Sequence, residues 1–225
     1  MKNDQDLAAL YEPRIYHDLR EPFPIRFLGY TVFREGGASS SFRDLELVPS
    51  DRGGWIVEYA VYYDYDIQHM YDLEHIWVEA GAGGQVTGCW GSFHGKRLRV
   101  DRLEAFRLEG THPVLYAEPG KHAFLPDPAL FTLHDQFPAC CREKAGGGLL
   151  IPGMLADRME TSPETDDMIR GYIREHYAFT PAGQYEPETL RPEQLIPWER
   201  LREEIPALVR SEIGRIRGGR ADLSF

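Results

Sequence analysis

The chain has 225 residues, of which 42% are apolar and 12% aromatic, and this composition suits one substantial domain rich in β structure. Its formal net charge of −11 excludes nucleic acid as an expected partner and disfavours an anionic membrane surface. The 3 cysteines exclude a disulfide framework, and no apolar run reaches signal-peptide length or the roughly 18 residues of a membrane span, so we expect a cytoplasmic protein without a transmembrane segment.

The first half of the chain is typical of a β protein. Residues 1–24 are polar and broken by prolines, so we expect them to form an arm laid over the domain. The strongest strand signal lies at 55–63, where apolar and aromatic residues occupy both alternating faces. A second strand at 72–79 and a third at 85–91 follow, joined by a glycine-rich turn as in a hairpin. Further strands are predicted at 25–34, 42–48, 96–100 and 113–118.

The second half changes from irregular to helical. Residues 125–153 are rich in Pro and Gly and predict a long irregular connection. Ser162 is a good N-cap for a helix at 163–177. An apolar stripe predicts a second helix at 192–216, which we expect Pro206 to divide. The fold class expected from this pattern is mainly β with C-terminal helices, or α+β overall.

Possible metal ligands gather between the two strongest strands. Because side chains alternate along a strand, Asp72 and Glu74 point to the same side, about 7 Å apart. Asp64 and Asp66 are matched in the same way at the end of the preceding strand, and His69 lies in the short loop between the pairs. Carboxylates with one histidine suit a divalent ion such as Mg²⁺, Mn²⁺ or Ca²⁺, or Zn²⁺ or Fe²⁺ where more nitrogen ligands are present.

The same spacing would arise from an acidic hairpin loop followed by solvent-facing strand residues. The face of Asp72 and Glu74 weighs against that alternative, because Ile76 and Val78 continue it into what should be core. Carboxylates at the rim of an apolar face need a counter-charge, which a cation would supply. His75 lies on the opposite face, so we expect it to be a core residue or to support a ligand from behind.

Other chemical signatures are weaker. His94 and His122 lie at strand ends, where a histidine is more often a surface or structural residue than a functional one. Neither Cys140 nor Cys141 has a flanking signature of a reactive thiol, and the glycine-rich segments do not match a phosphate loop or a dinucleotide fingerprint. The remaining histidines outside the acidic stretch are treated as structural: His17, His112, His134 and His176.

Four segments resemble, in the same order, motifs of the necrosis-inducing, Nep-like proteins and of the related vacuolar-sorting-associated group. Residues 68–75 resemble the motif Gly-His-Arg-His-Asp-Trp-Glu-His, and residues 59–66 resemble the strand before it. Residues 92–95 resemble Ser-x-His-x, and residues 113–123 resemble Pro-x-Val-Tyr-x-x-x-Gly-x-His-Ala. The resemblance covers about residues 55–125. It departs from the family pattern at three motif positions, which hold Gln68, Tyr71 and Leu73.

The resemblance implies a central β-sandwich with a divalent cation at one rim. It places the metal ligands at Asp66, His69, Asp72 and Glu74. It also matches His94 and His122 to histidines that line the same cavity. With the element pattern, this predicts a β-sandwich domain at 1–153, which includes the N-terminal arm and the metal site, and a helical extension at 154–225 packed on the same domain.

Two functions are compatible with such a site. The first is a cytoplasmic, metal-dependent enzyme of the hydrolase or lyase type acting on a small polar substrate, with His94 or His122 transferring a proton. The second is a metal-dependent protein that binds a glycan or a lipid head group, and a third interpretation makes the metal a purely structural staple. The amphipathic C-terminal helices are equally consistent with a lid, with packing on the sandwich and with a homodimer interface.

Overall fold

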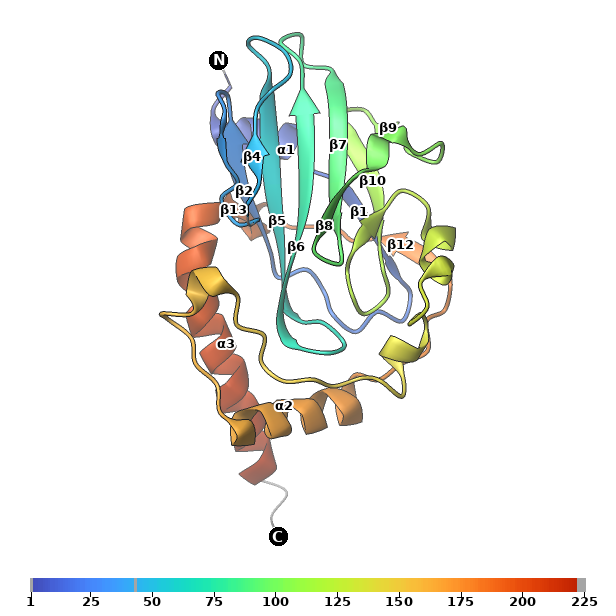
Figure 1. Cartoon of the computed structure of the whole chain (residues 1–225), viewed down its shortest axis with the longest axis vertical. Helices are drawn as coiled ribbons and strands as arrows, with labels where there is room; N and C mark the ends of the chain where they lie inside the picture. Colours follow the sequence, from blue (N-terminus) through green and yellow to red (C-terminus); the bar gives the residue numbers. More distant parts are fainter. Residues whose placement is uncertain (1, 43, 222–225) are drawn as a thin grey trace.

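The computed structural model describes residues 2–42 and 44–221, which form two β-sheets framed by helices (Figure 1). The larger sheet has six strands in the order β13-β2-β5-β6-β7-β8, all antiparallel except for the parallel pair β13–β2. Its strands are β2 (Phe27–Phe33), β5 (Trp55–Tyr65), β6 (Met70–Ala80), β7 (Val86–Phe93), β8 (Lys96–Arg99) and β13 (Leu195–Pro197).

The smaller sheet has the order β11-β10-β1-β12, with β9 also paired to β10. Strands β1 and β10 run parallel, and the other pairs are antiparallel. Its strands are β1 (Arg14–Asp18), β9 (Leu108–Glu109), β10 (His112–Ala117), β11 (Phe124–Leu125) and β12 (Tyr185–Pro187), and a separate two-stranded ribbon joins β3 (Gly37–Ala38) to β4 (Glu46–Leu47).

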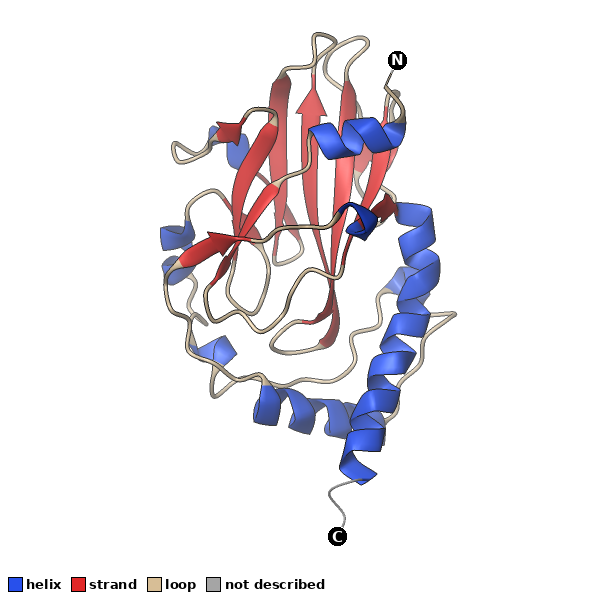
Figure 2. Ribbon diagram, turned by 180° about the vertical axis from the view of Figure 1, so that it is seen from behind, coloured by secondary structure: helices blue, strands red, loops and turns tan. Residues whose placement is uncertain are grey.

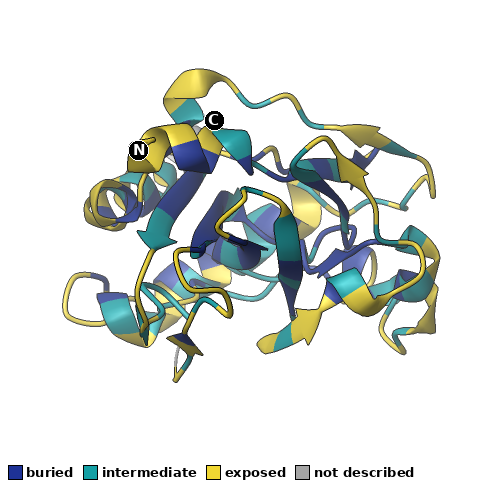
Figure 3. Cartoon of the chain, turned by 90° about the horizontal axis from the view of Figure 1, so that it is seen from above, coloured by how far each residue is buried: buried dark blue, intermediate teal, exposed yellow. Residues whose placement is uncertain are grey.

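The sheets approach closely where β11 crosses β7. A side chain at Gly91 would place its Cβ 2.9 Å from the backbone oxygen of Phe124, so only glycine allows this contact. Buried residues gather between the layers, while exposed residues lie on the periphery (Figure 3). The expected β-sandwich with C-terminal helices is therefore confirmed.

The long hairpin β5–β6 is the strongest sequence prediction, and it is confirmed with each strand extended by two residues towards the loop. The inward face of β5 carries Val57, Tyr59 and Val61, all fully buried. The facing positions on β6 are Val78, Ile76 and Glu74, so one continuous face passes from apolar core to carboxylate. Because every second side chain of a strand lies on the same face, this face carries apolar side chains in the core and a carboxylate at one end of the sandwich.

Three α-helices cover the edges: α1 (Asp4–Leu10), α2 (Pro163–His176) and α3 (Trp198–Ala221). Helix α1 packs on β2, and α2 meets α3 below the sheets (Figure 2). The predicted N-cap is confirmed, because the Ser162 side chain accepts a hydrogen bond from the amide of Thr165. Short 3-10 turns occupy Val100–Arg102, Pro128–Leu133, Ala139–Cys141, Gly153–Leu155 and Pro192–Gln194.

Some expectations about local structure are wrong. The last helix begins at Trp198 instead of residue 192, because residues 192–197 form a 3-10 turn and strand β13. Pro206 does not divide the last helix, because α3 continues through it. A proline inside a helix costs about 3 kcal/mol, and burial of Leu201, Ile205 and Val209 along α3, which packs on β2, β5 and β13, offsets that cost. Residues 1–24 are also more than an arm, since they contain α1 and a central strand of the smaller sheet.

The C-terminal third contributes to both sheets, through β12 in the smaller and β13 in the larger. All three cysteines are free and buried. Within residues 2–42 and 44–221, no helix is both long and apolar enough to cross a membrane.

Candidate functional site

The acidic loop between β5 and β6 is held from two sides. The amide of Ile67 donates to the carbonyl of Gly120 at 2.7 Å, which ties the loop to the turn after β10. On the other side, the amide of Gly146 donates to the carbonyl of Ile67 at 2.9 Å, and Met70 donates to the carbonyl of Gly148 at 3.0 Å. This double attachment fixes the position of the side chains between residues 66 and 74.

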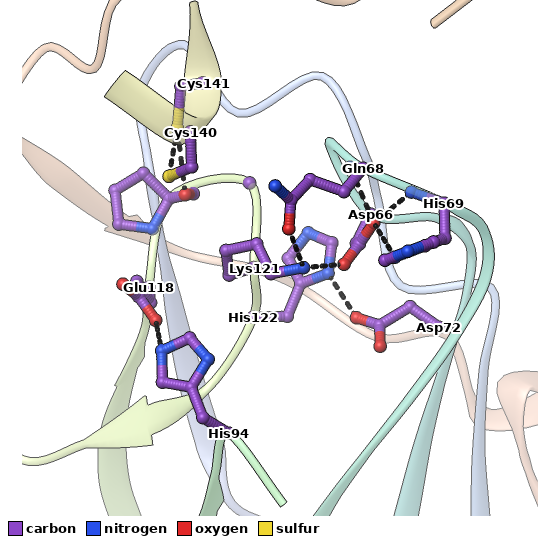
Figure 4. Close-up of polar contacts among 12 residues, drawn as sticks. Asp66, Gln68, His69, Asp72, His94, Glu118, Lys121, His122, Cys140 and Cys141 are labelled. Atoms are coloured by element: carbon purple, nitrogen blue, oxygen red, sulfur yellow. Dashed lines mark hydrogen bonds and ion pairs between the residues drawn. The ribbon is translucent and has the colours of Figure 1, made fainter. Parts of the chain in front are cut away.

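Asp66 organises the loop and holds a lysine. Its carboxylate accepts hydrogen bonds from the amides of Gln68, at 2.7 Å, and of His69. It also forms an ion pair with the Lys121 ammonium, which contacts the amide oxygen of Gln68 at 3.2 Å (Figure 4). Although burial opposes ionisation, hydrogen bonds and charge from His69 and Lys121 keep the pKa of Asp66 below its usual value.

Asp72 pairs with a second cation, His122. Its Oδ2 lies 2.7 Å from Nδ1 of His122, and the other ring nitrogen lies 3.4 Å from Oε1 of Glu21. The imidazole is fully buried and stacks on Tyr63 with ring centroids 3.8 Å apart. Burial alone would lower its pKa, but the carboxylates of Asp72 and Glu21 raise the pKa of His122 to about 10, so the ring is an imidazolium at neutral pH.

Glu74 has a hydroxyl partner. It accepts a hydrogen bond from Ser92, whose oxygen in turn accepts from the amide of His75 at 2.6 Å. Burial, and then the charge of Asp72, raise the pKa of Glu74 to about 8. A carboxyl group in this state gains from any additional positive charge placed beside it.

The charges around the loop do not balance. Acidic side chains outnumber basic ones, because four of them face one ammonium and one imidazolium, and negative charge stays in excess even while Glu74 is protonated. The acidic members are Asp66, Asp72, Glu74 and Glu21, and the basic members are Lys121 and His122. The excess negative charge makes this end of the sandwich suitable for a cation or for a ligand rich in hydrogen-bond donors.

A second cluster lies on the other side of the turn after β10. Nε2 of His94 is 2.7 Å from Oε2 of Glu118, and Nδ1 of His134 is 3.2 Å from Oε1 of the same residue. Within the described part of the chain, these three form the one group of at least three His, Cys, Asp or Glu whose ligand atoms all lie within 4.8 Å of one another. The sequence pattern had predicted a structural role for His134, and it gave no signal for Glu118.

The structure separates the six predicted site residues into two groups. Asp66, His69, Asp72 and Glu74 lie together around the loop, with His122 on Asp72, whereas His94 belongs to the cluster with Glu118. The assignment of the four as metal ligands stays a prediction, because in this conformation their partners are protein groups. The prediction that His75 faces away is confirmed, since its Nε2 lies 2.7 Å from the Ser41 hydroxyl and it stacks on Trp77.

Two residues of the loop site, Lys121 and Glu21, were missed. Lys121 lies between Gly120 and His122 in the motif at residues 113–123. Its basic side chain is the one sequence signal that could have indicated a cation of the protein itself beside the acidic loop. Glu21 comes from the segment expected to be an arm, and nothing local in the sequence links it to His122.

Comparisons with known proteins give a partial likeness. No protein-family model matches the chain, and no curated protein matches it. Among solved structures, NLPPya in complex with glucosamine is 16% identical with a TM-score of 0.38, covering 56% of this chain and 67% of that one. NLPPya in complex with mannosamine is 15% identical with a TM-score of 0.37 and the same two coverages.

A third structure is the necrosis and ethylene inducing protein 2 from the causal agent of cocoa's witches broom disease, 18% identical with a TM-score of 0.35, covering 52% of this chain and 66% of that one. It is of the kind that the sequence motifs resemble, whereas the vacuolar-sorting-associated part of the resemblance stays a prediction. At these scores the likeness is limited to part of the fold.

Proposed function

We propose that the protein binds a sugar bearing hydroxyl or amino groups at the loop between β5 and β6, with the help of a divalent cation. The observation that supports this proposal is the excess of four acidic side chains over two basic ones around one loop that is fixed from both sides. A site of this charge favours a cation and donor-rich ligands.

The donor set fits a hard or borderline divalent ion. Asp66, Asp72 and Glu74 offer carboxylate oxygens, and the imidazole of His69, 36% exposed, lies 3.4 Å from Asp66. Oxygen ligands with one nitrogen suit Mn²⁺, Ca²⁺ or Mg²⁺, and Zn²⁺ or Fe²⁺ remain alternatives. When bound, the ion would neutralise the carboxylates and offer coordination positions to ligand hydroxyls. The ammonium of Lys121 competes for the same oxygens and would move aside.

Charge also favours a glycan over a lipid head group as the ligand. The chain carries a net charge of −11, and the loop site adds a local excess of the same sign, so anionic lipid head groups are repelled. Sugar hydroxyls donate to carboxylates, and the ammonium group of an amino sugar complements them directly. A neutral or amino sugar is therefore the favoured ligand.

The histidines support binding more than proton transfer. A general acid or base works best with a pKa near the working pH and within reach of the substrate. The carboxylates beside His122 hold its pKa near 10 despite its burial, and the ring is closed in by Tyr63, Asp72 and Glu21. His94 is directed to Glu118 and away from the loop. A hydrolase or lyase reaction remains the less supported alternative.

Calorimetric titration tests the proposal. Glucosamine and mannosamine, with glucose as a neutral sugar, are titrated into the protein with Ca²⁺, Mn²⁺, Mg²⁺ or Zn²⁺ and after chelation. We expect sugar binding that needs an ion and that weakens at least tenfold in Glu74→Gln but not in Glu104→Gln, whose side chain is exposed. Absence of sugar binding with every ion, or binding unchanged by chelation and by Glu74→Gln, would overturn the proposal.

A cytoplasmic location and a homodimer belong to the same proposal. Cell fractionation and light scattering of the purified chain test them. Recovery of the protein in the membrane fraction or the external medium would contradict the location, and a monomer mass at high concentration would contradict the dimer.

A further inference from the structure

We propose that His94, Glu118 and His134 form a second metal site, suited to a borderline transition ion such as Zn²⁺ and independent of the sugar-binding proposal. Three segments distant in sequence bring one ligand atom each to within 4.8 Å of the others. Two imidazoles and one carboxylate are a donor set that Zn²⁺ uses when it keeps a coordination position open. The four residues assigned to the loop site take no part in it.

Local structure explains how the three side chains meet. His94 and Gly95 form the two central residues of the hairpin β7–β8, with φ angles of 48° and 73°, as a type I′ turn requires. Glu118 follows β10 directly, and its amide donates to the carbonyl of Ala123. His134 ends the 3-10 turn Pro128–Leu133, where its amide donates to the carbonyl of Phe131 at 3.1 Å.

One oxygen of the Glu118 carboxylate lacks a well-formed hydrogen bond, although the group is buried. The side chain is fully buried. Its Oε2 receives no hydrogen bond of acceptable geometry, even though Nε2 of His94 lies 2.7 Å away. A buried, incompletely satisfied carboxylate costs several kcal/mol, and such groups in proteins are normally paired or bind a metal. An ion between the two imidazoles would supply the missing interaction.

The spacing of the cluster agrees with a small ion. Tetrahedral Zn²⁺ with bonds of about 2.0–2.2 Å holds its ligand atoms roughly 3.3 Å apart. The contacts of Glu118 with His94 and with His134 are 2.7 and 3.2 Å, through different carboxylate oxygens, and all three ligand atoms lie within 4.8 Å of one another, so small side-chain rotations would bring them to this spacing. Two imidazole rings with centroids 4.5 Å apart face the same carboxylate, an arrangement that a shared metal stabilises.

The site is closed on one side and open on the other. Glu118 forms its buried floor, whereas the side chains of His94 and His134 are each 31% exposed. An ion therefore reaches the ligands from solvent and keeps a position for water. Figure 4 shows His94 and Glu118 apart from the group of Asp66, His69 and Asp72, with the turn that carries Lys121 between them.

Titration of the full chain with Co²⁺, followed by visible absorption, and X-ray absorption of the Zn²⁺ form test the inference. We expect the Zn²⁺ ion to be bound by two imidazoles. His134→Asn or His94→Asn should each lower the affinity for Zn²⁺ and Co²⁺ by more than roughly 100-fold, because removing a residue that only supports a metal ligand already costs roughly 10–100-fold. His176→Asn, an exposed histidine at the end of α2, is the matched control and should bind as the wild type does.

The experiment separates this site from the loop site. If both proposals hold, the wild type binds two ions, His134→Asn loses one of them, and Glu74→Gln loses the other. Circular dichroism confirms that each variant is folded, and asparagine is compatible with the positive φ angle of residue 94 in this exposed hairpin turn. Zn²⁺ affinity and spectrum unchanged in both His94→Asn and His134→Asn, or a wild type without a two-imidazole ion, would overturn the inference.

Discussion

Replacing Lys121 with methionine removes the built-in cation of the loop site and leaves the side-chain volume nearly unchanged. The Lys121 side chain is 15% exposed and that of Asp66 is 6% exposed, so the variant leaves a buried carboxylate without its ammonium. Removing one partner of a buried ion pair costs about 3–5 kcal/mol. Because Asp66 keeps the amides of Gln68 and His69 as donors, we expect a loss of about 3 kcal/mol in the free energy of unfolding.

The same variant should bind a divalent cation more tightly. A unit charge and a divalent ion about 6–8 Å apart repel by roughly 1–5 kcal/mol at effective dielectric constants of about 20–80. Loss of the ammonium therefore lowers the dissociation constant by roughly fivefold to a few thousandfold. Each tenfold gain in affinity adds about 1.4 kcal/mol of stability at a fixed, saturating ion concentration, so the ion should restore much of what the substitution removes.

Urea unfolding with and without Ca²⁺ or Mn²⁺, together with calorimetric titration of the ion, measures both effects. Lys96→Met is the control, because Lys96 is exposed on the edge strand β8 and its replacement should change the free energy of unfolding by less than about 0.5 kcal/mol. If Lys121→Met is destabilised but gains no more from the ion than Lys96→Met does, the loop is not a cation site. If it is as stable as the wild type, the ion pair with Asp66 is not the stabilising contact that the structure indicates.

The remaining predictions concern pH, packing and a helix end. The pKa of His122 is raised from 6.5 to about 10, so its stabilisation is complete below pH 6.5 and is lost as the pH rises through 10. The pKa of Glu74 is raised from 4.5 to about 8, so its contribution to stability is complete below pH 4.5 and is lost as the pH rises through 8. Together the two groups should lower the stability between pH 6.5 and 10 in urea titrations. A rise over that range would contradict both assignments. Gly91→Ala should cost about 1–3 kcal/mol, because its Cβ would meet Phe124, whereas Gly214→Ala, with open space around it in α3, should stabilise by up to about 1 kcal/mol in thermal unfolding. Equal changes in stability for Gly91→Ala and Gly214→Ala would contradict the close contact between the two sheets at Gly91. Ser162→Ala should cost about 1 kcal/mol by removing the N-cap of α2, and an unchanged melting temperature would show that the cap is dispensable.

The sequence was sufficient where the signal is local. Alternation along β6 places Asp72 and Glu74 on the face that continues as Ile76 and Val78, and His75 on the opposite face with Trp77. The structure confirms this division, because period-two patterning depends only on neighbours in the chain. The same holds for the N-cap at Ser162. The interruption expected at Pro206 failed because packing of α3 on the sandwich, a long-range effect, outweighs the preference of one residue.

The partners of the predicted residues could not be found in this way. Glu21 reaches His122 only because β1 pairs in parallel with β10, which brings the segment after β1 beside the turn after β10. His134 reaches Glu118 through a connection that the sequence describes only as irregular. Parallel pairing and long connections leave no periodic trace, so residues that complete a site across them become visible only when the fold is known.

The turn after β10 links the two candidate sites. The carbonyl of Glu118 accepts hydrogen bonds from the amides of both Lys121, at 3.0 Å, and His122, at 2.8 Å. Its side chain faces the two histidines on one side, while Lys121 and His122 face the acidic loop on the other. An ion that fixes Glu118 therefore also restricts the residues that neutralise Asp66 and Asp72. Because coupling between two binding equilibria is reciprocal, any influence of Zn²⁺ at the histidine cluster on cation affinity at the loop must be matched in the opposite direction.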